Sequence, residues 1–420
     1  MRPEILHTVR SYDRATLPHD VLAGITVAMV ALPLSLAIAI ASGADPGKGL
    51  ITAIIGGFLI SALGGSKVQI GGPTGAFIVV VYGVIAAHGY GGLVAATLMA
   101  GAILVVAGYL RVGNLIAYIP EAVVNGFTIG IAIIIATSQV QDLLGLSATH
   151  VPADFFPKVA ALWAARGSLR PETLAVGLIT MVLIVAFRRA APRLPGLIVA
   201  VALTSGVVWA LGLPVDSIVS RFGELPRTLP APALPDLSLE KLRELIPSAL
   251  IIAFLAAVES LLSAMVADRM IDARHRPNAE VAAQGFANMG SALFGGMPVT
   301  GAIARTATNV RAGGRTPVAG MVHAATVLVV MWVAAPLAGH LAMPALAGLL
   351  ILTAWNMSEP HKWRSYMQAR VSDRVLLLLT LTLTVVANLT LAIGVGVALG
   401  LALRLRRNDV KPAEWHTPEH

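Results

Sequence analysis

The amino-acid sequence predicts an all-α polytopic membrane protein, and three observations support this fold class. Hydrophobic residues make up 56% of the 420 residues and charged residues only 12%, which is too little charge to cover a soluble domain of this size. Apolar stretches long enough to span lipid recur from Gly24 to Leu403. The basic residues behind the net charge of +8 lie almost entirely between these stretches, so they indicate membrane topology and no nucleic-acid partner.

We expect about fourteen transmembrane segments, several of them too short to cross alone at about 1.5 Å of rise per residue. The last apolar run is divided only at Asn388. The expected segments are Val21–Ala41, Leu50–Leu63, Pro73–Ala87, Gly91–Leu110, Ala122–Val140, Thr173–Phe187, Gly196–Leu213, Ala249–Val266, Val281–Phe294, Gly301–Val310, Val318–Ala338, Ala345–Trp355, Val375–Ala387 and Leu389–Leu403.

The distribution of Lys and Arg sets the expected topology. With both termini in the cytoplasm, most basic residues fall on the cytoplasmic side, as the positive-inside rule requires. We expect a multi-pass protein of the inner (plasma) membrane. Its expected parts are a cytoplasmic N-terminal segment at residues 1–20, a transmembrane domain at 21–407 (repeat one about 21–213, repeat two about 249–407) and a short cytoplasmic tail at 408–420.

Two long loops lie outside in this topology. The first, Asp142–Glu172, carries an amphipathic stretch at Phe155–Ala165 that is expected to lie along the membrane interface. The second, Pro214–Ser248, is rich in proline and ends in a short charged helix at Leu237–Leu245.

A Gly/Pro element occurs twice, about half a chain apart. Ile70–Ala76 reads IGGPTGA, and Phe294–Ala302 reads FGGMPVTGA, and each copy opens a short apolar segment. Because each half holds seven expected segments, an odd number, the second half inserts upside down relative to the first. This pattern predicts two inverted repeats of seven with a binding site at the midplane, in which segments 3 and 10 are half-helices.

The two elements predict an anion site. Proline cannot continue a helix from upstream, and the glycines allow an extended, closely approached backbone. Thr74 and Thr300 are suitable N-cap residues, and each half-helix would aim free N–H groups and its positive end at a shared centre. The alternative is a pair of ordinary kinks packed through small residues. Pro73 and Pro298 lying far apart would rule the site out. The expected anion-binding residues here are Thr74, Gly75, Ala76, Thr300, Gly301 and Ala302.

Two ionisable residues lie well inside apolar segments, Arg305 and Glu259. A charge there costs at least about 2.5 kcal/mol on insertion scales, so both are functional candidates. Arg305 keeps its charge and would supply fixed positive potential to the anion. Glu259 can take up a proton or hold Na⁺, and is the candidate for coupling. The structural alternatives are an Arg305–Glu259 pair or an arginine that reaches the cytoplasmic surface.

Other polar residues carry weaker expectations. Ser35, two residues after Pro33, could line the site or bond its own helix. Asn309 could contribute to the site, although such residues most often join neighbouring helices. His88 and His323 are expected to be peripheral.

The chain offers no recognisable catalytic or metal centre. It has no cysteine, which excludes disulfides and thiolate metal sites. No nucleophile–base or metal-ligand cluster lies in the spans, which argues against an intramembrane enzyme. We therefore expect no catalytic residues, no metal and no cofactor.

From Asp20 to about Arg407, the sequence resembles the SulP (sulfate permease) family of anion transporters, which includes prestin-like and pendrin-like proteins. The pieces that carry the resemblance are Asp20–Gly24 (DVLAG) with Pro33, Gly72–Gly75 (GPTG), Pro120–Phe127 (PEAVVNGF), Glu259–Asp268 (ESLLSAMVAD), Asn278 and Glu280 with Gln284 and Asn288, and Pro298–Asn309 (PVTGAIARTATN).

The resemblance implies core and gate domains, an anion bound between segments 3 and 10, an acidic coupling position at Glu259, and a homodimer. Family members generally carry a cytoplasmic STAS domain after the last segment. Here only about a dozen residues follow the membrane, too few for a domain, so no STAS domain is expected.

The sequence therefore favours a secondary transporter of small inorganic or carboxylate anions (sulfate, bicarbonate or dicarboxylate) that works by alternating access with proton symport through Glu259. Three alternatives remain open: a sodium-coupled bicarbonate symporter, an uncoupled anion channel, and a nucleobase permease on the same type of fold.

Overall fold

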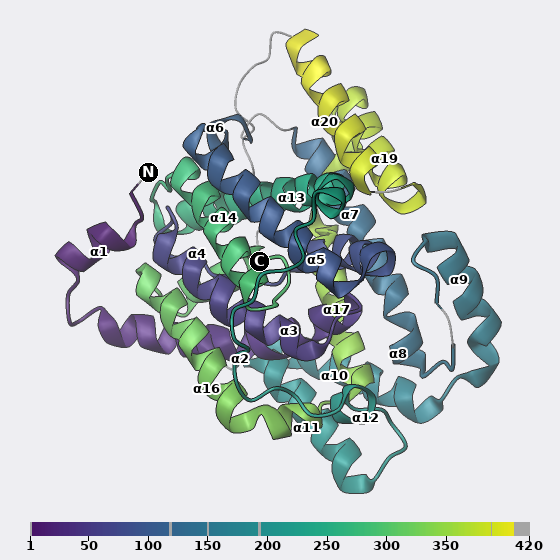
Figure 1. Cartoon of the computed structure of the whole chain (residues 1–420). Coiled ribbons are helices and arrows are strands. Elements are labelled where there is room, and N and C mark those ends of the chain that lie inside the picture. The colour runs from purple at the N-terminus through teal and green to yellow at the C-terminus, as the bar shows by residue number, and fades with distance from the viewer. Residues whose placement is uncertain (1, 117–119, 149–150, 192–194, 388, 407–420) are drawn as a thin grey trace.

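The computed structural model describes residues 2–116, 120–148, 151–191, 195–387 and 389–406. The expected division at Asn388 and the tail at 408–420 lie outside these residues. Within the described chain, seven helices are long and apolar enough to cross a membrane, and Gly196–Leu211 is a shorter apolar helix. The predicted all-α membrane architecture is confirmed (Figure 1), whereas the count of fourteen crossings stays a prediction.

The helices follow the expected apolar segments closely. The first half comprises α1 (Ile5–Ser11), α2 (Leu17–Ala41), α3 (Pro46–Ile51), the π-helical turn η1 (Thr52–Gly56), α4 (Gly57–Leu63), β1 (Gly71–Gly72), the 3₁₀ turn η2 (Gly75–Phe77), α5 (Ile78–Tyr109), α6 (Gly113–Ile116), α7 (Glu121–Ser138), α8 (Val140–Leu144), α9 (Phe155–Ala164), the 3₁₀ turn η3 (Ala165–Ser168), α10 (Pro171–Ala190) and α11 (Gly196–Leu211).

The second half comprises α12 (Ile218–Phe222), α13 (Leu239–Ile271), α14 (Pro277–Leu293), β2 (Thr300–Gly301), α15 (Ile303–Arg311), α16 (Pro317–Gly339), α17 (Met343–Met357), the 3₁₀ turn η4 (Pro360–Lys362), α18 (Trp363–Gln368), α19 (Val371–Val386) and α20 (Leu389–Arg406).

Two boundaries differ from the sequence expectation. The charged stretch Leu237–Leu245 is no separate loop helix, because it is continuous with the following apolar segment in α13. Pro247 lies inside α13, and the polar residues that precede it belong to the same helix. The third and fourth expected segments join in α5, where Gly89 adopts a left-handed φ of 68° and marks the kink between them.

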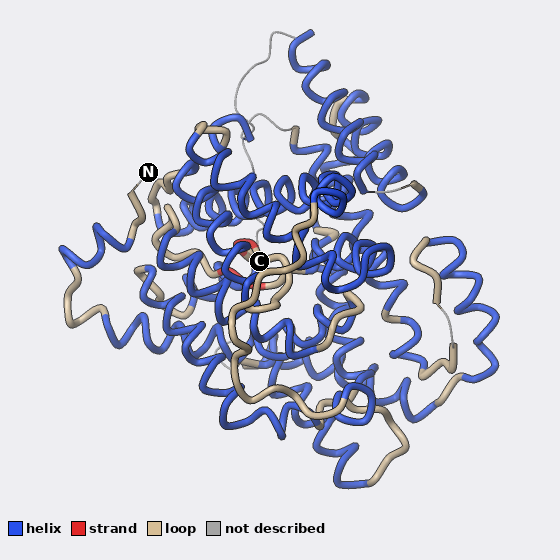
Figure 2. Tube along the Cα trace, in the orientation of Figure 1, coloured by secondary structure: helices blue, strands red, loops and turns tan. Residues whose placement is uncertain are grey.

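The helices pack in two groups. The first group contains α2 to α5 and α13 to α16, in which α5 packs on α13 and α14 and α2 packs on α16. The second group contains α7, α8, α10, α11, α17, α19 and α20, in which α7 packs on α17 and α19 (Figure 1). Contacts of α2 with α11 and α17 join the groups. Both short strands lie deep within the first group, surrounded by helices (Figure 2).

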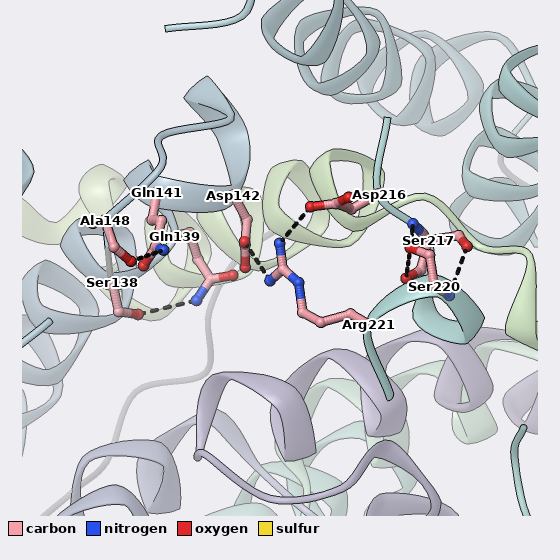
Figure 3. Close-up of polar contacts among 9 residues, drawn as sticks. All are labelled: Ser138, Gln139, Gln141, Asp142, Ala148, Asp216, Ser217, Ser220 and Arg221. Carbon is pink, nitrogen blue, oxygen red and sulfur yellow. Dashed lines mark hydrogen bonds and ion pairs between the residues drawn. The ribbon is translucent and has the colours of Figure 1, made fainter. Parts of the chain in front are cut away.

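Two of the connections that pass between the groups are bonded to each other. The α11–α12 connection meets the α16–α17 connection through the backbone, where Ile218 N–H donates to the Leu341 carbonyl at 3.0 Å and Met343 N–H donates to the Asp216 carbonyl at 2.8 Å. Arg221 of α12 forms ion pairs with Asp142 of α8 at 2.6 Å and with Asp216 at 3.2 Å (Figure 3). These contacts attach α12 to the end of α8.

A buried carboxylate ties the N-terminal segment to the turn after α15. Asp20 is fully buried and accepts hydrogen bonds from Arg315 N–H at 2.8 Å, from Thr316 N–H at 3.2 Å, from the Thr316 hydroxyl and from the Tyr12 hydroxyl at 3.1 Å. Burial, together with the charge and hydrogen bond of Asp20, raises the pKa of Tyr12 to about 12, so the phenol stays protonated and continues to donate.

We predict that Asp20→Ala lowers the free energy of unfolding by about 2–4 kcal/mol, because it leaves the buried donors of Arg315 and Thr316 unpaired. Denaturation of the detergent-solubilised protein measures the change. Asp13→Ala is the matched control, since exposed Asp13 accepts only a local bond from Ala15 N–H and should shift stability by less than about 0.5 kcal/mol. Equal losses in the two variants would contradict the assignment.

Candidate functional site

The two Gly/Pro elements meet as a pair of antiparallel strands. Gly71 of β1 pairs with Gly301 of β2, and Gly72 pairs with Thr300. The ladder extends by one more bond, from Ala302 N–H to the Ile70 carbonyl at 2.9 Å. The predicted extended, closely approached backbone is therefore present. The sequence predicted an all-α fold and did not predict that the two segments pair through backbone hydrogen bonds.

Both elements break the chain between helices, as the site hypothesis required. Pro73 lies between β1 and η2, and Pro298 lies between α14 and β2, so neither proline is inside a helix. The helical segments η2–α5 and α15 begin a few residues after the paired strands. Their first N–H groups have no acceptor within their own helix, and the positive ends of both helix dipoles lie at the strand pair. Such a junction can attract an anion.

Thr74 occupies the predicted N-cap position at the start of η2, but its side chain forms no cap hydrogen bond. For Thr300 the prediction is wrong, because the N-cap residue of α15 is Ala302. The Thr74 hydroxyl donates instead to Oε2 of Glu259, and the Thr300 hydroxyl to the Ala256 carbonyl, each at 2.8 Å. The reason is that α13 runs beside both breaks and offers acceptors to each hydroxyl. The two threonines attach the breaks to α13.

Arg305 lies directly behind β1. Its side chain is 1% exposed, and its Nη2 donates to the Ser35 hydroxyl at 3.1 Å. Nη1 lies so close to the Cα of Gly72 that a Cβ there would collide with it. Nη1 and Nε have no hydrogen-bond partner among the described residues, and there is no ion pair between Arg305 and Glu259 in that part of the chain. The guanidinium thus has two nitrogen atoms without an acceptor and no counter-charge in contact among the described residues.

Glu259 on α13 is the acidic residue next to the first break. The residue is partly buried, and its carboxylate accepts a hydrogen bond from the Thr74 hydroxyl. The neighbouring Ser260 is fully buried and accepts a bond from Nε2 of Gln69 at 2.7 Å. The carboxylate is therefore fixed to the first break by Thr74.

Glu280 on α14 is fully buried and contacts Ser260, the neighbour of Glu259. It accepts bonds from Gly65 N–H at 2.9 Å, Ser66 N–H at 3.2 Å, Gln284 Nε2 at 2.8 Å and the Ser260 hydroxyl at 3.1 Å. These four donors satisfy the charge, so Glu280 acts as a structural anchor for the turn that leads into β1.

Two further contacts fix α15 against the strand before the first break. The Thr306 hydroxyl accepts from Ile70 N–H at 3.1 Å, and Nδ2 of Asn309 donates to the Val68 carbonyl at 2.8 Å. Asn309 thus joins neighbouring segments. Ser35, by contrast, contacts the guanidinium of Arg305.

The expectation that His323 is peripheral is wrong. Its side chain is fully buried in α16, and neither ring nitrogen has a hydrogen-bond partner among the described residues. Sequence patterning missed this because α16 is apolar around its whole circumference, so a single histidine does not show which side it faces. His88 forms an ion pair with Glu244 at 3.4 Å. The described residues contain no group of three or more His, Cys, Asp or Glu side chains able to hold a metal ion.

Comparison with known proteins gives matches over most of the chain. Residues 17–380 match the model of the sulfate permease family. The "Putative sulfate transporter YvdB" of Bacillus subtilis (strain 168) is 41% identical over 370 residues, which cover 88% of this chain and 70% of that protein. The bicarbonate transporter BicA of Picosynechococcus sp. is 32% identical over 340 residues, 79% of this chain and 60% of BicA. The chain thus spans about 60–70% of the length of these relatives.

Solved structures show the same fold. The transmembrane domain of a cyanobacterial BicA superposes with a TM-score of 0.80 at 29% identity, covering 93% of this chain and 98% of that domain. The structure of SLC26A9 superposes with a TM-score of 0.87 at 17% identity and covers 96% of this chain and 68% of that one. At that identity the second match concerns the fold alone.

We predict that Gly72→Ala weakens anion binding at least about tenfold, since the added methyl group would displace the Arg305 guanidinium from β1 and change a close charge contact. Titration of the purified protein with sulfate or bicarbonate, followed by calorimetry, measures the affinity. Gly83→Ala on α5 is the matched control, because a Cβ there meets nothing within 4 Å. Unchanged affinity in Gly72→Ala would contradict the position assigned to Arg305.

Proposed function

The chain belongs to the sulfate permease family, and we propose that it is a secondary transporter of small anions of the sulfate, bicarbonate or dicarboxylate class that works by alternating access. Its membrane-spanning helices and its family both support anion transport. The proposed anion site comprises the backbone at Thr74, Gly75 and Ala76, the backbone at Thr300, Gly301 and Ala302, and the guanidinium of Arg305.

The observation that carries this proposal is the unpaired charge of Arg305 behind two helix starts. A buried guanidinium with free N–H groups is costly unless an acceptor arrives. The adjoining ends of η2–α5 and α15 add positive potential of the same sign. An anion at the junction would accept from the free guanidinium N–H groups and would lie at the positive ends of both helices, where low polarity strengthens the attraction.

We predict that Arg305→Ala abolishes uptake of labelled sulfate or bicarbonate into proteoliposomes, because the remaining helix ends provide only partial charges. Arg311→Gln is the control: Arg311 lies on the same helix and is exposed, so uptake should stay near that of the wild type. Undiminished uptake by Arg305→Ala would remove this residue from the mechanism.

We also propose that transport is coupled to protons through Glu259. Its carboxylate is tied to the first break by Thr74 and has no basic side chain in contact among the described residues. Protonation would release the Thr74 hydroxyl from a charged acceptor, which links the charge state of α13 to the geometry of the anion site. Sodium in place of the proton is the second candidate, because the same carboxylate chemistry can hold Na⁺, and the similarity to the bicarbonate transporter BicA makes bicarbonate the substrate to test with it.

We predict that Glu259→Gln removes the dependence of uptake on a pH gradient, because an amide cannot exchange a proton with either side. Uptake driven by an imposed gradient, compared with uptake at equal pH, measures this dependence. Glu244→Gln, an exposed carboxylate on the same helix, serves as the control. Replacing Na⁺ by choline in the wild-type assay separates the two ions: loss of uptake on replacement would establish sodium coupling.

The remaining parts of the proposal concern assembly and orientation. We propose that the protein is a homodimer, as its family resemblance implies. We also propose that it lies in the inner (plasma) membrane with both termini cytoplasmic, and the distribution of basic residues supports this orientation. The division into repeats at about 21–213 and 249–407 also remains a proposal. An uncoupled channel would carry currents far above carrier turnover, and a nucleobase permease would be inhibited by uracil.

A further inference from the structure

The amphipathic helix α9 places a lysine against the first helix of the candidate site. Lys158 is 5% exposed although it belongs to a connecting segment. Its Nζ lies over the ring of Tyr82 on α5, 5.1 Å from the ring centroid. Tyr82 is itself held, because its hydroxyl donates to the Val151 carbonyl at 3.3 Å. The lysine is therefore docked in a defined position.

The ammonium of Lys158 has no carboxylate partner among the described residues. Asp154, at the exposed start of α9, is close enough to influence it but forms no ion pair with it. Burial lowers the pKa of Lys158, and Asp154 only partly opposes this. The aromatic ring compensates part of the lost hydration. The contact with the Tyr82 ring is thus the interaction that positions the ammonium within the described chain.

The position of Tyr82 relates this lysine to the candidate site. Tyr82 follows Gly75 by seven residues on η2–α5, a distance of about 10 Å along the helix. On the other side, the ring lies near the turn after α2, where a Cβ on Gly43 would come within 3.3 Å of its Cδ2. Lys158 thus lies beside the outer part of α5, away from the break at which this helix begins.

We propose that Lys158 forms a second anion-binding subsite, which recruits an oxyanion from the side of α9 before it reaches the junction of the two breaks. This inference rests on the proposed transport function. A largely buried ammonium without a carboxylate partner among the described residues favours an anionic oxygen, and its field would concentrate anions on the α9 side of α5. The anionic oxygen could come from the free substrate or from a lipid phosphate, and the proposal commits to the substrate.

Uptake kinetics measured separately from each side of oriented proteoliposomes test the subsite. Lys158→Met, which removes the charge and keeps the stem, should raise the KM for sulfate or bicarbonate about 3- to 10-fold from the α9 side at low ionic strength. KM from the other side and kcat should stay at wild-type values. Adding about 1 M of a salt that is not transported, which shortens the Debye length to about 3 Å, should remove most of the difference.

Three further arms make the result specific. Lys158→Arg should restore the wild-type KM, because it keeps the charge. Lys241→Met is the matched control, since exposed Lys241 is paired with Asp236 at 2.5 Å, and its KM should not change. The Lys158→Met effect should be the same in pure phosphatidylcholine and in vesicles containing phosphatidylglycerol.

The contrary results are distinct. An unchanged KM in Lys158→Met, or an equal rise from both sides, overturns the subsite. A KM effect that occurs only with phosphatidylglycerol assigns Lys158 to a lipid headgroup and also overturns it. Absence of anion uptake by the wild-type protein refutes the proposed function instead, so the two failures are distinguishable.

Discussion

The structure depends on the pairing of β1 with β2. Extended backbone within a membrane is tolerated only when its N–H and C=O groups have partners inside the protein, and here each break supplies the partners of the other. The paired glycines leave room for two buried side chains, because a Cβ on Gly72 would displace the end of Arg305 and a Cβ on Gly301 would displace the end of Gln69. The position of the buried guanidinium therefore depends on the glycine at position 72. The pairing also determines where α5 and α15 begin.

The helix α13 holds both breaks and keeps the two buried charges apart. It accepts the Thr74 hydroxyl at Glu259 and the Thr300 hydroxyl at the Ala256 carbonyl, and its Ser263 donates to Thr306 of α15. Arg305, meanwhile, extends behind β1 toward Ser35. Direct pairing of Arg305 with Glu259 would neutralise both. Because each lacks that partner, the proposed roles of the arginine toward an anion and of the carboxylate toward a cation are compatible with each other.

The sequence was sufficient to predict the features that depend on composition and on local backbone chemistry. Apolar length predicted the helices, and the GGP and GGMP elements predicted two non-helical breaks, because proline and glycine act locally. The partners of side chains could not be predicted. Nothing in the sequence around Thr74 shows that α13 lies beside it, so a cap was expected where an interhelical bond exists. The same limit applies to His323, since an apolar helix gives no periodicity to indicate which face is buried.

The packing of the helices bears on how such a site can move. Both breaks, Arg305 and Glu259 belong to the first packing group, so a relative motion of the two groups leaves the strand pair intact. Motion must be absorbed where the groups are connected. There the α11–α12 and α16–α17 connections are bonded together, and Arg221 attaches them to α8 through Asp142 (Figure 3). Charged side chains that are partly exposed exchange partners at little cost, whereas the buried backbone ladder cannot. At the connections the Arg221 ion pairs are therefore the exchangeable contacts, while the backbone bonds of the connections and of the strand pair stay fixed, which is compatible with the proposed rigid-body alternating access.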